Sequence, residues 1–263
     1  MKKKVETKYL DKEWKEMNTR LKGFLDAGYQ EDLHKFRVQI KKLRAMLSLF
    51  EVASRRHGLL KDFKPVKKIF KEVGEIREAY INLQLAEHYK LKNEHFEASQ
   101  QEIIQRGVYQ FCQMGKKHTK TIKDVYSRLK KNLTRIDDSS ISEYYKKQLE
   151  QIAGNLETPN FTEDMHNNRK LIKILVYNHK LVDEALNGSF QFNAQYLDKL
   201  QDNIGQWHDN LIAAQLFSTP ELHDKPVVNQ IKRKNAGVRR TITSMARGFM
   251  QKATTVKKPV SVK

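Results

Sequence analysis

Two tracts of this sequence recur about 131 residues further along the chain. The first is His34-x-x-Arg37-x-x-x-Lys41, which matches His166-x-x-Arg169-x-x-x-Lys173 at an offset of 166 − 34 = 132. The second is Gly74-x-x-Arg77-Glu78, which matches Gly205-x-x-His208-Asp209 at an offset of 205 − 74 = 131. Two independent matches at nearly one offset predict a tandem duplication, because self-similarity at a fixed period marks a repeated structural unit.

The chain between and around these tracts has the pattern of amphipathic helices. It holds only 5 Pro and 11 Gly in 263 residues, which favours long uninterrupted helices over a sandwich of short strands. The expected helices cover residues 9–27, 31–54, 61–90 and 96–135, with a break near Gly107 or Gly115, and then 141–156, 163–186, 193–217 and 225–251. We therefore expect an all-α single domain over 1–263, with four-helix half-repeats at about 1–137 and 138–253 and a basic tail at 254–263.

The helix expected at 31–54 carries two neighbouring stripes of side chains, because residues three, four or seven apart share a helix face. One stripe is apolar and should face a core: Leu33, Phe36, Ile40, Leu43, Leu47 and Phe50. The other stripe is basic: His34, Arg37, Lys41 and Arg44. Like charges on one face destabilise an isolated helix, so this row calls for an anion, neighbouring acids or water. The helix at 163–186 repeats the basic row with His166, Arg169 and Lys173, extended by Lys180.

The overall charge favours a polyanionic partner. Lys and Arg total 50 against 31 Asp and Glu, so the formal net charge is 50 − 31 = +19, and such a charge attracts any polyanion in a salt-dependent way. The single cysteine, Cys112, excludes an internal disulfide and a C-x-x-C zinc pattern. Residues 1–4 are basic, but charged residues follow where a signal peptide needs an apolar stretch, so we expect a cytoplasmic protein.

The duplicated motifs resemble the conserved histidine α-helical domain, or CHAD domain, over nearly the whole chain. The resemblance implies two four-helix bundles related by a pseudo-twofold, with a basic central channel or cleft between them. It also implies binding of inorganic polyphosphate without catalysis. We expect no cofactor and no metal, and an association with polyphosphate granules. The sequence departs from the pattern in its second half, where Val176 stands opposite Arg44, His208 replaces an arginine, and Leu211 stands where the family has an acid.

The residues themselves support the same class of ligand. A polyphosphate carries negative charge and no bases, so a site for it needs Arg and Lys on rigid helices rather than aromatic platforms. We expect it to contact His34, Arg37, Lys41, Lys42, Arg44, His166, Arg169, Lys170, Lys173 and Lys180. Further contacts, for which a solvated face or a polar clamp between helices is the alternative, are Arg77, Lys116, Lys120, Lys123, His208, Arg233 and Arg240.

Three other interpretations stay open. The first is an RNA- or DNA-binding helical protein, although single-strand binders usually place aromatic residues among the basic ones for stacking. The second is an enzyme that acts on a phosphorylated substrate, for which the sequence offers no evident nucleophile or carboxylate cluster. The third is a di-iron site, because Glu31-x-x-His34 and Glu163-x-x-His166 are both E-x-x-H. Arg37 and Arg169 follow on the same faces and would repel a dication.

Overall fold

The computed structural model describes residues 3–55, 57–188 and 190–255. The described part of the chain is α-helical and contains no strand, as the sequence predicts. The predicted basic tail at 254–263 lies outside the described residues except for its first two positions. The helices are α1 (Lys3–Ala27), α2 (Gln30–Ala53), α3 (Leu59–Asp62), α4 (Lys64–Glu72), α5 (Gly74–His88), α6 (Glu94–Gln113), α7 (Gly115–Asn132), α8 (Asp138–Glu157), α9 (Glu163–Ala185), α10 (Ala194–Leu216), α11 (Lys225–Ala246) and α12 (Phe249–Thr254).

The apolar stripe of α2 forms the centre of the core, as predicted. All six of its members are buried, with exposed fractions of 3% or less. The corresponding stripe of α9 consists of Met165, Asn168, Ile172, Leu175, His179 and Val182, and it is buried as well except for His179, which is half-buried. Its polar member Asn168 accepts a hydrogen bond from Nδ2 of Asn155 at 2.8 Å. Helix α1 packs along α2, and Gly28, with φ +66°, makes the tight turn between them.

The prediction of a single helix at 61–90 is wrong, because the chain bends twice within this range. Helices α3, α4 and α5 are separated at Phe63 and Val73, whose side chains are 2% and 0% exposed. Both bends bury the residue at which the helix changes direction. Pro65 stands in the first turn of α4, where its missing N–H leaves no intrahelical hydrogen bond unmade.

Two other long helices are interrupted. The range 96–135 divides into α6 and α7 at Met114, next to Gly115, so the break expected near Gly115 is confirmed and the one near Gly107 is not. A side chain at Gly115 would meet Leu25 of α1 at 3.1 Å, so the glycine permits this close approach. The range 225–251 divides at Gly248, whose φ of +64° ends α11 before α12 begins.

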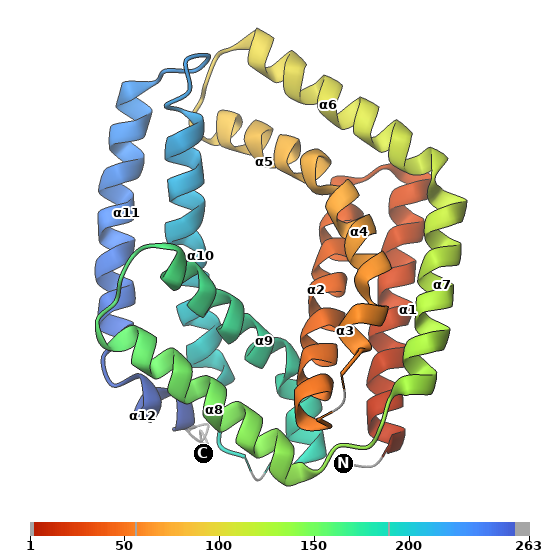
Figure 1. The fold of residues 1–263 in the computed structure, drawn as a ribbon. Helices are drawn as coiled ribbons and strands as arrows, with labels where there is room; N and C mark the ends of the chain where they lie inside the picture. Colours follow the sequence, from red (N-terminus) through yellow and green to blue (C-terminus); the bar gives the residue numbers. More distant parts are fainter. Residues whose placement is uncertain (1–2, 56, 189, 256–263) are drawn as a thin grey trace, which may run out of the picture.

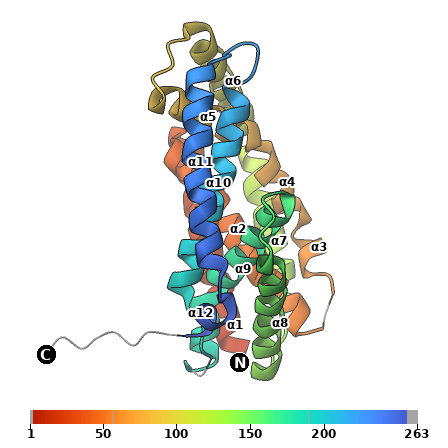
Figure 2. The ribbon, with the colours of Figure 1, turned by 90° about the vertical axis from the view of Figure 1, so that its left-hand side faces the viewer.

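The helices are arranged as a closed frame that is much narrower when seen edge-on (Figures 1 and 2). In Figure 1, α2, α5, α9 and α10 form the inner side of this frame and are called the inner helices below. Helices α1, α7, α6, α11 and α8 lie outside them. The two helices that carry the duplicated basic motif, α2 and α9, pack against each other.

The frame has two hydrophobic cores. The main core includes α1 to α4 and most of the second half. A small separate core joins the ends of α5 and α10, where Phe217 is fully buried and its ring centroid lies 5.3 Å from that of Tyr89. Nδ2 of Asn93 donates a hydrogen bond of 3.4 Å to the carbonyl of Glu221 at the same junction. These contacts close the frame at the end furthest from α8.

None of the helices in the described residues is long and apolar enough to cross a membrane.

Candidate functional site

The duplicated basic residues lie on the inner helices. His34, Arg37 and Lys41 come from α2, and His166, Arg169 and Lys173 come from α9. Arg77 on α5 and His208 on α10 join them. We call these eight residues the inner cluster. The core stripe of each motif helix fixes the direction of its basic stripe. A buried hydrogen bond of 3.0 Å from Nδ2 of Asn178 to the carbonyl of Ala45 ties α9 to α2.

Arg37 is held against α4. Its Nη1 donates a hydrogen bond of 2.7 Å to the carbonyl of Phe70, and its guanidinium lies 4.0 Å from the centroid of the Phe70 ring. Stacking on a ring and a charged hydrogen bond restrict the rotamers of a long side chain. Among the described residues, the other N–H groups of this guanidinium form no hydrogen bond, so Arg37 is a rigid positive group with spare donors.

Arg169 makes the matching contact in the second half. Its Nε donates a hydrogen bond of 3.2 Å to the carbonyl of Gln201. The two acceptors correspond under the predicted offset, since 201 − 70 = 131. Arg169 also lies directly on Gly205, because a side chain there would come within 2.6 Å of its Nη2. The absence of a side chain at Gly205 therefore creates the place where this guanidinium rests.

The two motif histidines each face a cationic or imidazole group on the next inner helix. Burial lowers the pKa of His34, and the charge of Arg77 lowers it further. The His166 ring stacks on His208 with centroids 4.2 Å apart. Burial and then His208 lower the pKa of His166. Both motif histidines are thus mostly neutral at pH 7. The buried Nδ1 of His166 has no hydrogen-bond partner among the described residues.

Lys41 experiences the charges of both halves. Solvent reaches its side chain, but the surrounding protein removes part of the amine's hydration, and this is the largest of the causes that together lower its pKa to about 8. Repulsion from Arg37, Lys173, Arg169 and Arg77 supplies the rest of this lowering, in that order of effect. Four cations from three helices therefore surround a fifth. Their mutual repulsion is an energy that a bound anion would remove.

Lys173 occupies the matching place in α9, but acids moderate its surroundings. Burial and Arg169 lower its pKa, whereas Asp202, Asp198 and Asp209 of α10 raise it. Nε2 of Gln201 donates to carboxylate oxygens of Asp198 at 2.9 Å and Asp202 at 2.6 Å. The second half of the inner cluster is consequently less electropositive than the first.

Four of the predicted contacts are not members of the inner cluster, although the charge of Lys170 still lowers the pKa of His166. Lys42 and Lys180 line a cavity of about 830 Å³ between α1, α2, α9 and α10, which the inner cluster does not line. Lys170 is exposed and pairs with Glu163 at 3.1 Å. Arg44 is exposed at the basic row's end.

The predicted outer contacts also lie elsewhere. Lys116, Lys120 and Lys123 line a cavity on α7 and α1 beside Cys112. Arg233 is exposed on α11, and Arg240 lines another cavity on that helix. The structure therefore joins Arg77 and His208 to the motif residues but separates these five.

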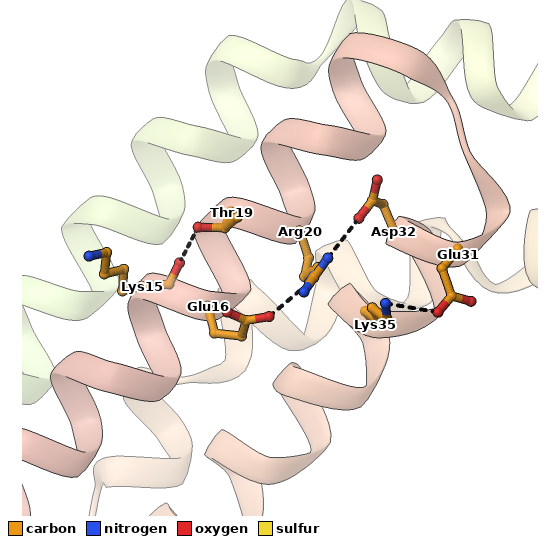
Figure 3. Close-up of polar contacts among 7 residues, drawn as sticks. All are labelled: Lys15, Glu16, Thr19, Arg20, Glu31, Asp32 and Lys35. Carbon is orange, nitrogen blue, oxygen red and sulfur yellow. Dashed lines mark hydrogen bonds and ion pairs between the residues drawn. The ribbon is translucent and has the colours of Figure 1, made fainter.

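The acids at the start of the motif helices have structural partners. Figure 3 shows Arg20 of α1 between Glu16 and Asp32, with N–O distances of 2.8 Å and 3.3 Å. Glu31 pairs with Lys35 at 2.9 Å. In the second half, the hydroxyl of Thr162 accepts a hydrogen bond from the amide of Asp164, so Thr162 is the N-cap of α9.

Sequence reasoning missed the partners that fix the two arginines. The acceptors at Phe70 and Gln201 are main-chain carbonyls, which leave no mark in a side-chain pattern. Gly205 and its match Gly74 were recognised as part of a repeat, but only Gly205 is crowded by an arginine, whereas a side chain at Gly74 would meet nothing within 4 Å. The acids Asp198 and Asp202 were also missed. Their spacing of seven and three residues from Gly205 places them on the same helix face as that glycine, and this was the available signal.

The fold has a counterpart among solved structures. The crystal structure of the CHAD domain from the plant Ricinus communis matches it with a TM-score of 0.61, covering 96% of this chain and 88% of that chain at 16% sequence identity. At this identity the match shows the fold alone. No curated protein sequence matches this chain significantly. The sequence model of the CHAD domain family matches residues 8–218, which is most of the chain. The protein therefore belongs to the CHAD domain family.

Proposed function

We propose that this protein binds inorganic polyphosphate through the inner cluster and does not catalyse a reaction on it. The CHAD family is associated in general with polyphosphate binding. The observation that carries the proposal for this chain is the convergence of cations from both halves around Lys41. A linear polyanion that runs along the inner faces of α2 and α9 would neutralise all of them at once.

The side chains suit phosphate oxygens. Arg37 and Arg169 each use part of a guanidinium on a main-chain carbonyl, which aims the rest of the fork. Arginine offers paired donors to phosphate, and lysine offers a point charge.

The aromatic residues of the site favour polyphosphate over single-stranded nucleic acid. The Phe70 ring is covered by the guanidinium of Arg37, and Nζ of Lys173 lies 5.7 Å from the centroid of the Tyr177 ring. Cations therefore occupy positions that stacked bases would need. Nucleic acid remains the second candidate, because the net charge of +19 attracts it without any specific contact.

We expect binding without turnover. The inner cluster consists of cations and imidazoles, and the carboxylates nearest to Lys173 are already hydrogen-bonded by Gln201. No group in it is arranged as a nucleophile beside a base. Within a cell, we place the protein in the cytoplasm on polyphosphate granules, and co-sedimentation with isolated granules would test this location.

The decisive experiment is competition between long polyphosphate and single-stranded RNA of equal charge for the purified protein at physiological salt. The proposal predicts that polyphosphate displaces RNA, and that its affinity falls steeply between low and moderate salt as counterion release is lost. The variant Arg37→Glu with Arg169→Glu should bind far more weakly than Lys116→Glu with Lys120→Glu. Both variants change the net charge by −4, but the second lies on the outer helix α7. Equal losses, or preference for RNA, would overturn the proposal.

A further inference from the structure

A second group of arginines lies on the outside of the frame. Helix α11 forms one outer edge in Figure 1 and faces the viewer in Figure 2. A cavity of about 510 Å³ on this helix is lined by Arg239, Arg240 and Arg247, by Thr243 and Ser244, and by Phe161 from the turn before α9. Helix α11 lies outside the inner helix α10, and no member of the inner cluster lines this cavity, which we call the outer arginine cavity.

The position of these arginines follows from the amphipathic pattern of α11. Its buried face consists of Val228, Ile231, Asn235, Val238, Ile242 and Ala246. The arginines are exposed beside this face, at spacings that place them on one side of the helix. Arg240 and Arg247 are seven residues apart, which corresponds to about 10 Å along the helix axis. The row therefore offers positive charge over the length of a short chain, rather than at a point.

One of the three arginines is held in place. The guanidinium of Arg239 lies 4.5 Å from the centroid of the Phe161 ring. That ring in turn packs edge-on against Trp207, at 5.6 Å between centroids, and Trp207 is only 3% exposed. The stack fixes one guanidinium on the buried part of α10, so part of the entropy cost of ordering this side chain is met before a ligand arrives.

The charged residues that line the outer arginine cavity are all arginines. Among the described residues that line the outer arginine cavity, none is acidic. Arg247 also lines the neighbouring cavity, to which Glu157 contributes a carboxylate. The face of Phe161 is already covered by Arg239, which leaves no aromatic surface for a nucleobase.

We infer that the outer arginine cavity is a second phosphoanion site that takes a short linear phosphate chain. Forked donors from three arginines would bind the phosphate oxygens, and Thr243 and Ser244 would add hydroxyl groups. The site does not depend on the inner cluster, because the two share no residue. A protein with both sites could hold two phosphate chains, or two segments of one long chain, on opposite sides of α10.

Isothermal titration with tripolyphosphate tests this inference. The parent should show two classes of sites. The variant Arg239→Gln, Arg240→Gln, Arg247→Gln should lose the outer class, with a weakening on the order of 10- to 100-fold. A matched control is Lys232→Gln, Arg233→Gln, Lys234→Gln, which removes three exposed charges from the same helix but none from the cavity. It should weaken this class by less than about threefold, since screening limits distant charges.

The inner variant Arg37→Gln with Arg169→Gln separates this inference from the proposed function. It should keep the outer class intact, so failure of polyphosphate binding at the inner cluster leaves the outer prediction measurable. Equal losses in the cavity variant and its control, with both folded by circular dichroism, would overturn the outer site. Displacement of tripolyphosphate from this class by single-stranded RNA of equal charge would also overturn it, in favour of a nucleic-acid contact.

Discussion

The two halves of the molecule use the same hydrogen bond but surround it differently. In the first half, Arg37 donates to the carbonyl of Phe70 and lies on the ring of that residue. In the second half, Arg169 donates to the carbonyl of Gln201 and lies on the bare backbone at Gly205. The arginine position is thus preserved by two unrelated means, an aromatic ring in one case and a missing side chain in the other.

The charges around the arginines differ more than their positions. Asp198 and Asp202 raise the pKa of Lys173, whereas Lys67 and Lys71 stand at the matching places of the first half, since 198 − 67 = 131 and 202 − 71 = 131. The comparison teaches that the geometry of a basic site and its electrostatic strength are set by different residues. We therefore expect the first half to contribute more of the affinity for an anion.

The largest expected effect is the loss of one motif arginine. Arg37→Ala should cost about 1.5–3 kcal/mol of polyphosphate binding, as for hydrogen bonds to charged groups. Arg169→Ala should cost less, because acids already offset part of its field. Isothermal titration at one salt concentration measures both. A larger loss for Arg169→Ala would reverse the ranking of the two halves.

Gly205→Ala should damage only the second half. The new methyl group would lie within 2.6 Å of Nη2 of Arg169 and force the guanidinium off α10. Overpacking of this kind costs about 1–3 kcal/mol of stability, less what the side chain recovers by moving. The matched control is Gly74→Ala, where nothing lies within 4 Å, so better helix propensity should raise stability by up to about 1 kcal/mol. Thermal unfolding compares them, and equal shifts would show that Arg169 does not need the glycine.

The pH dependence of binding should come mainly from the first half. The Lys41 amine has a pKa of about 8, and a bound anion favours its charged form and raises that pKa. The amine must then gain a proton on binding above pH 8, so affinity falls as pH rises. A rise of one unit on binding predicts a loss of about fivefold between pH 7 and pH 9.

Lys41→Arg should flatten this pH profile, because arginine stays charged throughout the range. Lys173→Arg should flatten it less, since Asp202 and Asp198 counteract the lowering of the Lys173 pKa. Affinity titrations at pH 7, 8 and 9 measure the profile. A parent whose affinity is constant over this range would contradict the assignment of Lys41.

The smallest expected effect is a gain, rather than a loss, of affinity for the anion. Asp198→Asn with Asp202→Asn should tighten anion binding by about two- to fivefold, because exposed charges contribute little each. The matched control is Asp124→Asn, an exposed acid on the outer helix α7. If the double variant and the control tighten binding equally per charge removed, only the net charge of the protein matters. The local charges of the two halves would then not explain a difference in affinity.

The sequence predicts the motif helices well and the segments between them poorly. The apolar stripes place α2 and α9 within one residue of their observed ends, because a long amphipathic period leaves little choice. The breaks at Phe63 and Val73 were not predicted, because both residues fit the apolar pattern of one helix, and the boundary signals that follow them, Pro65 and Gly74, were read as lying within it.

The candidate site was likewise predicted only in part. The residue types of the inner cluster were predicted from the duplicated rows. The sequence did not predict that Lys42 and Lys180 line a different cavity from the inner cluster. The direction in which a long side chain leaves a packed helix decides which cavity it enters. The support for Arg37 and Arg169 comes from carbonyls of another helix, and such support is determined only by tertiary packing.

The central claim is that both halves bind one polyphosphate chain. Isothermal titration of Arg37→Ala, Arg169→Ala and the double variant with polyphosphate of one defined length tests it most directly. We predict that each single change weakens the tighter class of binding while the number of chains bound per protein stays constant, and that the double change costs at least about the sum of the two. If either single variant keeps the parent affinity and binds half as many chains, the halves are separate sites and the claim is wrong.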